Sequence, residues 1–210
     1  ETMGRYEIRK AATVEETAAA MALRRRVFVE EQGLFASSDQ DQHDRNAICI
    51  NAWKGTELIG TVRCYPDPKD ETIWWGSRLA VHEAYRAKGV GVYLIEAAVE
   101  EMRLKQVGRF LAQVQLQNVP LFEKLGWKPV SDVILLHGHP HQTMEANLHV
   151  RDASWLRRRQ KVGTQGRRTR PARAAGPGGP LDDGLRQESI QRPQPCRRNG
   201  ALAVLRVGDA

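Results

Sequence analysis

The sequence predicts an α/β protein with a mixed central sheet and helices on its faces. Strand and helix patterns alternate through the first 150 residues, which requires helices packed against a sheet. An apolar fraction of 41% with only 6% aromatic residues suits such a domain. After about Val150 the composition becomes rich in Arg, Pro and Gly, without periodicity. We therefore expect a folded domain at 1–150 and a disordered tail at 151–210, because the tail cannot bury enough apolar surface.

The first half of the domain reads as a strand, a helix and a hairpin. Tyr6–Lys10 alternates polar and apolar residues, as a strand does. Thr13 precedes two acids, which predicts a helix N-terminus and a helix that continues to about Arg25. An apolar stretch at 27–35 with an acidic interruption and a polar loop at 37–46 come next. Two strands joined by a Gly-containing turn follow, Ile48–Trp53 and Leu58–Tyr65.

The second half supplies the remaining strands and the longest helix. Ile73–Val81 is a strand rich in Trp, Leu and Val. Val90–Gln106 is predicted to be an amphipathic helix from the spacing of its apolar residues, Val90, Leu94, Ile95, Ala98 and Met102. The last elements are three strands and one short helix that Gly126 closes: Phe110–Leu116, Pro120–Leu125, Trp127–Leu136 and Thr143–Leu148.

Charge and cysteine usage narrow the classes of partner. The net charge of +7 comes from the tail, because acidic and basic residues nearly balance in 1–150. Nucleic acid is therefore not an expected partner of the folded domain, although an RNA- or membrane-binding tail remains an alternative. No apolar run reaches the roughly 18 to 20 residues that a membrane span needs. The three separated cysteines form no disulfide framework, so we expect a cytoplasmic protein.

One turn between a strand and a helix carries the main chemical signal, Arg86-x-x-Gly89-x-Gly91. Glycines let backbone N–H groups approach phosphate oxygens, and the helix N-terminus adds unsatisfied donors and a positive dipole end. Arg86 and Lys88 would add charge-assisted contacts. Taken alone, the turn fits equally well a tight connection that simply requires glycine. It matches neither a Walker A loop nor a dinucleotide fingerprint.

Two segments resemble the GNAT family of N-acetyltransferases. Leu79–Gly91 is similar to that family's acyl-CoA-binding segment, and Asn118–Trp127 is similar to a segment that ends in Tyr-Glu-Lys-Leu-Gly-Phe. The resemblance implies the GNAT fold, in which two parallel strands splay apart around the pantetheine arm. It also implies coenzyme A contacts from these residues: Leu79, Ala80, Val81, Arg86, Ala87, Lys88, Gly89, Val90, Gly91, Asn118 and Phe122.

Two further segments, Leu23–Gln32 and Gly138–Met144, resemble the ElaA-type acetyltransferases and a nitrogen-starvation acetyltransferase group. This similarity implies acetyl-CoA as the acyl donor, a small-molecule amine as the acceptor and direct attack of the amine on the thioester. It further implies that 27–46 and 133–144 build the acceptor pocket, and that sheet-edge or hairpin contacts make a homodimer. A lactone-synthase-like activity is a remote variant, because those folds are related.

Phe122 departs from the family pattern, because many members have there a Tyr that protonates the leaving thiolate. Phenylalanine has no proton to donate. Another group or water then serves, or the thiolate leaves unassisted, or the protein is a non-catalytic acyl-CoA-binding module with a sensing or scaffolding role. Asn118 offers a pantetheine contact, or a helix N-cap, or both.

The catalytic candidates are Glu31 and Tyr65. Glu31, next to Glu30, would act as a base or bind an amine, although acids beside an Arg run are often paired on the surface. Tyr65 ends a strand near the expected acceptor cleft, whereas its neighbour Cys64 reads as a small core residue. His137, His139 and His141 lack Cys or acids in a ligand pattern, so we expect no metal site.

Overall fold

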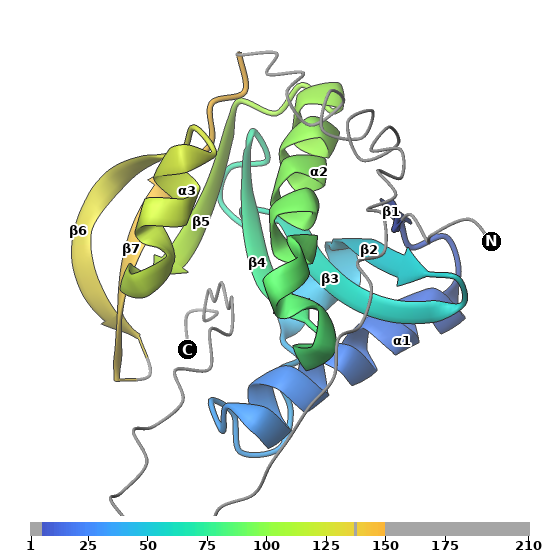
Figure 1. Cartoon of the computed structure of the whole chain (residues 1–210). Coiled ribbons are helices and arrows are strands. Elements are labelled where there is room, and N and C mark those ends of the chain that lie inside the picture. Colours follow the sequence, from blue (N-terminus) through green and yellow to red (C-terminus); the bar gives the residue numbers. More distant parts are fainter. Residues whose placement is uncertain (1–5, 137, 150–210) are drawn as a thin grey trace, which may run out of the picture.

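The computed structural model describes residues 6–136 and 138–149. They form a seven-stranded sheet in the order β1-β2-β3-β4-β5-β7-β6 (Figure 1). Every neighbouring pair is antiparallel except β4 and β5, which are parallel. The strands are β1 (Glu7–Lys10), β2 (Ile48–Lys54), β3 (Glu57–Pro66), β4 (Ile73–Val81), β5 (Arg109–Gln115), β6 (Lys128–Leu136) and β7 (His139–Glu145). The predicted mixed α/β sheet is confirmed, whereas the tail at 151–210 lies outside the described residues.

In the described part of the chain three α-helices cover the sheet, α1 (Val14–Arg25) on one face and α2 (Val90–Leu104) and α3 (Val119–Lys124) on the other (Figure 1). The five apolar residues that predict α2 are all buried, so this helix packs as its pattern requires. They belong to the main core cluster, which lies between α2, α3 and strands β2 to β5. Among the described residues, no helix has both the length and the apolar character needed to cross a membrane.

The N-terminal helix begins where the sequence predicts, but the chain stays helical beyond the predicted end at Arg25. Thr13 accepts a hydrogen bond from the Glu16 backbone N–H at 3.2 Å, which caps α1. After Arg25 the chain does not leave the helix but continues as a π-helical segment, Arg26–Glu31. Within it, Val27 and Phe28 are buried against Leu23 of α1 and Ala80 of β4. The widened turn thus keeps the apolar residues on the sheet and brings Glu31 to Arg86, which follows the end of β4.

The C-terminal hairpin is longer than the sequence predicts. β7 begins at His139, four residues before the expected start at Thr143, and ends at Glu145. The strand starts earlier because His139 and Pro140 already pair with β6, and from His141 to Glu145 it also pairs with β5. Gly138, with φ of +75°, lies in the turn before the strand, where a left-handed backbone favours glycine.

Candidate functional site

The parallel strands β4 and β5 separate in the middle of the sheet. Their pairing runs from Ile73 opposite Arg109 to Gly76 opposite Ala112. Beyond this point β4 continues to Val81 and β5 to Gln115, with no further pairing between these two described strands. Backbone N–H and C=O groups that face the gap therefore lack the partners that a continuous sheet would give them.

A bulge in β4 lies at the start of this gap. Arg78 has φ of +50°, and the β3–β4 register shifts between Thr61 and Arg63. Ser77 and Arg78 consequently both point to the α1 face, where Arg63 Nε donates to Ser77 Oγ at 2.9 Å. A bulge of this kind bends its strand and re-aims side chains. It turns the end of β4 away from β5.

The glycine turn leads from the end of β4 into α2. Residues Glu83–Lys88 form a 3₁₀ helix, Gly89 is left-handed with φ of +78°, and α2 begins at Val90. No described side chain caps α2, so the first backbone N–H groups of this helix are available for an anion. Lys88 is exposed and lies over the Tyr85 ring at 4.8 Å.

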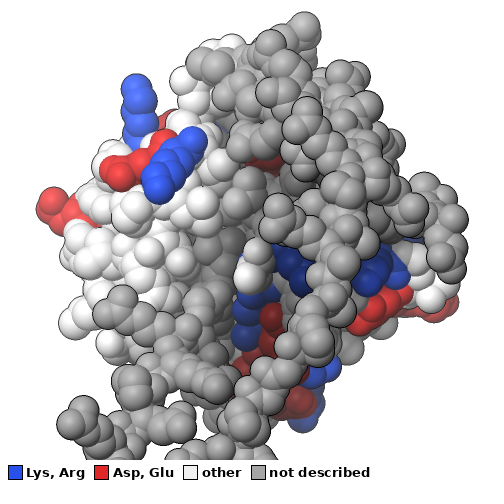
Figure 2. All heavy atoms as spheres, viewed as in Figure 1, with Lys and Arg blue, Asp and Glu red and all other residues white. Residues whose placement is uncertain are grey.

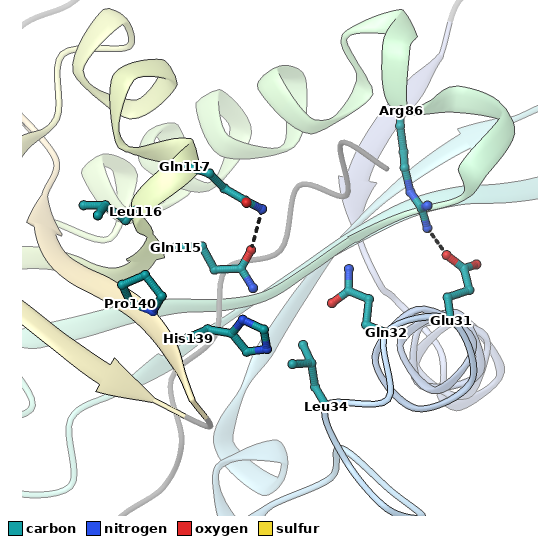
Figure 3. A pocket seen from close by; sticks show the side chains of 9 residues that line it. All are labelled: Glu31, Gln32, Leu34, Arg86, Gln115, Leu116, Gln117, His139 and Pro140. Carbon is teal, nitrogen blue, oxygen red and sulfur yellow. Dashed lines mark hydrogen bonds and ion pairs between the residues drawn. The ribbon is translucent and has the colours of Figure 1, made fainter. Parts of the chain in front are cut away.

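An open cleft of about 590 Å³ lies beside this turn on the α1 side of the sheet (Figure 3). Glu31 is one of its lining residues and Arg86 another, and the two side chains form an ion pair across the cleft wall. Arg86 Nε also donates to the Val81 carbonyl at 2.9 Å. Glu31, predicted as a catalytic residue, and Arg86, predicted as a coenzyme A contact, therefore lie together, because the π-helical segment and the glycine turn converge here. Glu30, by contrast, is an exposed partner of Arg25 at 3.5 Å.

The cleft also contains residues that the sequence reasoning missed. Gln115 and Gln117 lie at the carboxyl end of β5, and Gln117 Nε2 donates to Gln115 Oε1 at 3.1 Å (Figure 3). Their position just after a parallel strand is a signal, since ligands bind beyond the carboxyl ends of such strands. The others come from the predicted acceptor segments, namely Gln32, Leu34, His139 and Pro140. Leu116 completes the lining.

Tyr65 lies outside this cleft. Its side chain is fully buried with Trp75 and Leu111, and its ring stacks on His43 at 4.2 Å. Cys64, beside it, is also fully buried, and burial raises the pKa of its thiol. Its role as a small core residue is therefore confirmed, whereas a catalytic role for Tyr65 stays a prediction.

The other predicted coenzyme A contacts come from the end of β4, the glycine turn and α3. Leu79 and Val81 belong to the main core cluster, whereas Ala80 packs with Val27 on the α1 face. Asn118 occupies the N-cap position of α3, but its side chain makes no capping hydrogen bond. Phe122 is 2% exposed and packs against Trp127. The remaining predicted contacts belong to the glycine turn and the first turn of α2, and comprise Ala87, Lys88, Gly89, Val90 and Gly91.

Three acids of the predicted polar loop 37–46 form a buried ionic cluster with three arginines from α1, β3 and β4. Its members are Arg24, Arg63, Arg78, Asp39, Asp41 and Asp44. Arg24 contacts Asp39 and Asp44 at 2.6 Å each, and the three guanidiniums are at most 2% exposed. The cluster fixes loop 35–46 against the sheet beside Leu34, which lines the cleft.

Burial and the neighbouring charges have opposite effects on these acids. Burial raises the pKa of Asp44, but hydrogen bonds and charge from Arg24, together with Arg63, outweigh it, so the net pKa is well below its usual range. Burial also raises the pKa of Asp41, but hydrogen bonds and charge from Arg63 outweigh it, so the net pKa is lowered. Burial, with the like charge of Arg63, lowers the pKa of Arg78 to about 10, so Arg78 remains charged at neutral pH.

Within the described part of the chain, no group of three or more His, Cys, Asp or Glu side chains is arranged to hold a metal ion. His139 lines the cleft, and His141 is buried with its Nδ1 2.8 Å from the His139 carbonyl oxygen. His137 lies outside the described residues.

Residues 12–127 match the model of the acetyltransferase (GNAT) family. A Bacillus subtilis protein named as a candidate acetyltransferase is 27% identical over 140 residues, 65% of this chain and 93% of that protein. The crystal structure of Escherichia coli ElaA is 25% identical, with a TM-score of 0.61 over 69% of this chain and 100% of ElaA. BjaI, a coenzyme-A-dependent acyl-homoserine lactone synthase solved with isopentyl-CoA, has a TM-score of 0.60 at 19% identity over 78% of this chain and 91% of its own.

Proposed function

Because the chain belongs to the acetyltransferase (GNAT) family, we propose that it transfers an acetyl group from acetyl-CoA to the amine of a small molecule. The family match and the ElaA structure confirm the resemblance and the GNAT fold predicted from the sequence. The coarser assignment, an acyltransferase fold that uses an acyl-CoA, follows from the family and from coenzyme-A-dependent neighbours. We propose acetyl as the transferred group and the amine of a small molecule as its acceptor.

The separation of β4 and β5 next to the glycine turn carries this proposal. The turn presents uncapped N–H groups at the start of α2, which suits a pyrophosphate. On the side that faces β5, the end of β4 from Leu79 to Val81 pairs with no described strand. Its backbone groups there, apart from the Val81 carbonyl that accepts from Arg86, suit the amides of a pantetheine arm. A donor held at both places would put its thioester in the gap beside Gly76 and Ala112.

The cleft on the opposite face supplies the acceptor side. An amine that enters past Glu31 and Gln115 would attack the thioester carbonyl carbon from the α1 face. The C–N bond forms, the C–S bond breaks, coenzyme A leaves as the thiolate, and the ammonium formed loses a proton. Glu31 is the carboxylate of the cleft, and we assign it the binding of the acceptor ammonium and the acceptance of its proton.

A second candidate function, a non-catalytic acyl-CoA-binding module, is favoured by one observation. Phe122 is buried in the core and has no proton for a leaving thiolate. Phe122→Tyr separates the two functions. If the wild type turns over robustly and Phe122→Tyr leaves the rate unchanged, the non-catalytic module is excluded. If activity appears only in Phe122→Tyr, the non-catalytic module is supported.

Turnover is the direct test of the proposed enzyme. Release of free thiol from acetyl-CoA is measured with the full chain across a panel of small amines. We expect at least one amine to be acetylated, and Glu31→Gln to lower kcat/KM for it by about 10²-fold, the scale of general acid–base catalysis. Measurable acetyl-CoA binding with no turnover for any amine would contradict the enzyme and favour the module.

The donor site has its own test by charge reversal. Lys88→Glu places a carboxylate at the glycine turn, where it would repel a pyrophosphate, so acetyl-CoA affinity should fall about tenfold, or about 1.4 kcal/mol. Lys124→Glu is the matched control, because it reverses an exposed lysine at the end of another short helix, α3. Equal affinity of both variants in titration calorimetry would place the donor elsewhere.

The proposal also includes a homodimer and a cytoplasmic location. β6 is one of the two edge strands of the described sheet, and its Val133 is 48% exposed and its Leu135 74% exposed. Edge strands with exposed apolar residues pair readily with a second chain. Light scattering of the wild type and Leu135→Lys tests this assembly, with a dimer expected for the first and a monomer for the second. Among the described side chains visible in Figure 2, acidic and basic groups lie next to one another, which suits a domain that does not bind nucleic acid.

A further inference from the structure

A small apolar chamber lies at the point where β4 and β5 separate, among residues of the core that α2 and α3 cover. It has a volume of about 20 Å³. Gly76 and Ala112, the last paired residues of the two strands, both contribute to its wall. The other lining residues are also apolar: Val62, Leu79, Ile95, Ala98, Phe110, Phe122 and Trp127.

Three aromatic rings close this chamber. Phe110 and Phe122 pack against Trp127 with ring centroids 5.3 and 5.2 Å away, in tilted and edge-to-face arrangements. All three side chains are 4% exposed or less. A Cβ added to Gly76 would lie 3.1 Å from Phe110 Cζ, so this ring occupies the space that any larger residue would need. The chamber cannot lengthen unless one of these rings moves out of a close-packed core.

The chamber and the open cleft lie on opposite faces of the same gap. Ala112 and Leu79 face the α2 side and belong to the main core cluster. Gln115, from the same strand as Ala112, lines the cleft together with Glu31. A thioester in the gap would therefore have its acceptor on one side and this apolar space on the other.

We propose that the chamber receives the acyl group of the donor and restricts it to acetyl, with Phe110, Phe122 and Trp127 as the residues that set the chain length. This inference rests on the proposed function. A volume of about 20 Å³ holds roughly one water-sized group, which is the size of a methyl. The methyl of an acetyl group fills it, and each additional methylene has to displace an aromatic ring.

The test compares the affinity of the full chain for free coenzyme A and for acetyl-, butyryl- and hexanoyl-CoA by titration calorimetry. The wild type should bind acetyl-CoA about tenfold or more tightly than hexanoyl-CoA, as pockets that discriminate single methylenes do. Phe122→Ala removes one ring and should reduce this ratio at least tenfold. Ala112→Val narrows the chamber from the opposite wall and should weaken acetyl-CoA about tenfold while free coenzyme A binds as before.

Phe28→Ala is the matched control, because Phe28 is equally buried but packs with Val27 and Ala80 on the other face. It should leave the ratio of acetyl to hexanoyl affinity unchanged. Ala112→Val keeps the inference testable if Phe122→Ala does not fold. Equal wild-type affinity for all chain lengths, or unchanged ratios in the chamber variants that fold, would overturn the chamber and leave the proposed function standing. Absence of binding for every thioester would instead overturn the proposed function.

Discussion

The two faces of strands β3 and β4 are built from different chemistry, although their residues are neighbours in the chain. Arg63 and Arg78 project toward loop 35–46 and join the buried ionic cluster. Val62 and Leu79, each adjacent to one of them, line the apolar chamber below α2 and α3. Apolar burial stabilises without direction, whereas three guanidiniums and three carboxylates satisfy one another in only a few arrangements.

Because their chemistry differs, the two faces of the sheet contribute differently to the protein. The apolar face supplies the burial that holds α2, with its glycine turn, against the sheet. The ionic face contributes less net stability, because charges lose hydration when they are buried. What the cluster provides is one fixed course for loop 35–46, next to the cleft in which the acceptor is proposed to bind.

Removal of one cluster acid should give the largest effect. Asp39 is 1% exposed and contacts both Arg24 and Arg78, at 2.6 and 3.2 Å. Asp39→Ala leaves two buried guanidiniums without this partner, and the free energy of unfolding should fall by about 3–5 kcal/mol in urea. The exposed Asp132→Ala serves as control, with a change within about 0.5 kcal/mol. A loss for Asp39→Ala no larger than that of the control would show that the cluster contributes nothing.

A cavity on the apolar face should lower the free energy of unfolding slightly less than Asp39→Ala does. Leu94 is fully buried in α2 and packs over Gly60 of β3. Leu94→Ala should lower the free energy of unfolding by about 3 kcal/mol, within the usual range for buried leucines. Because no charge is removed, the loss should be the same at pH 4 and pH 7. A loss that varies with pH would contradict the division between the two faces.

Acid should weaken the ionic face selectively. Asp41 and Asp44 have native pKa values below their usual range, so the unfolded chain takes up protons first as the pH falls below about 4. Their contribution is present above that pH and is lost as the pH falls toward the native pKa values. Stability should therefore drop by at most about 1.4 kcal/mol per pH unit for each group.

Urea unfolding between pH 5 and pH 2 measures this loss. Asp44→Asn removes one of the two titrating acids and should give a shallower decline than the wild type. The same slope for both proteins would mean that other carboxylates cause the acid sensitivity.

An exposed ion pair should give the smallest effect. Arg109 Nη2 lies 2.8 Å from Glu145 Oε2 across strands β5 and β7, with the arginine side chain 47% exposed. Arg109→Ala should change the free energy of unfolding by less than about 1 kcal/mol, because solvent screens such pairs. A loss comparable to that of Asp39→Ala would show that burial is not what separates the two kinds of pair.

The sequence by itself determined the elements and the main motif. Apolar spacing gave α2 and its five buried residues, and the glycine turn appeared where the chain needs a left-handed Gly89 between a 3₁₀ turn and a helix. Such features depend on residues close together in the chain, so a local pattern reports them. The α/β class and the family resemblance followed from the same patterns.

Only the tertiary structure decided which distant residues meet. The pairing of Glu31 with Arg86 and the ionic cluster both join segments far apart in sequence. The π-helical continuation of α1 packs Val27 and Phe28 against Ala80 of β4, which is also distant in the chain. A charged residue in a polar loop has the same local pattern whether it ends in water or beneath a strand, so Asp39 gave no signal of burial. The gap likewise depends on a bulge at Arg78 and on the last pair, Gly76 and Ala112. Pairing between strands sets these features, and no single strand records it.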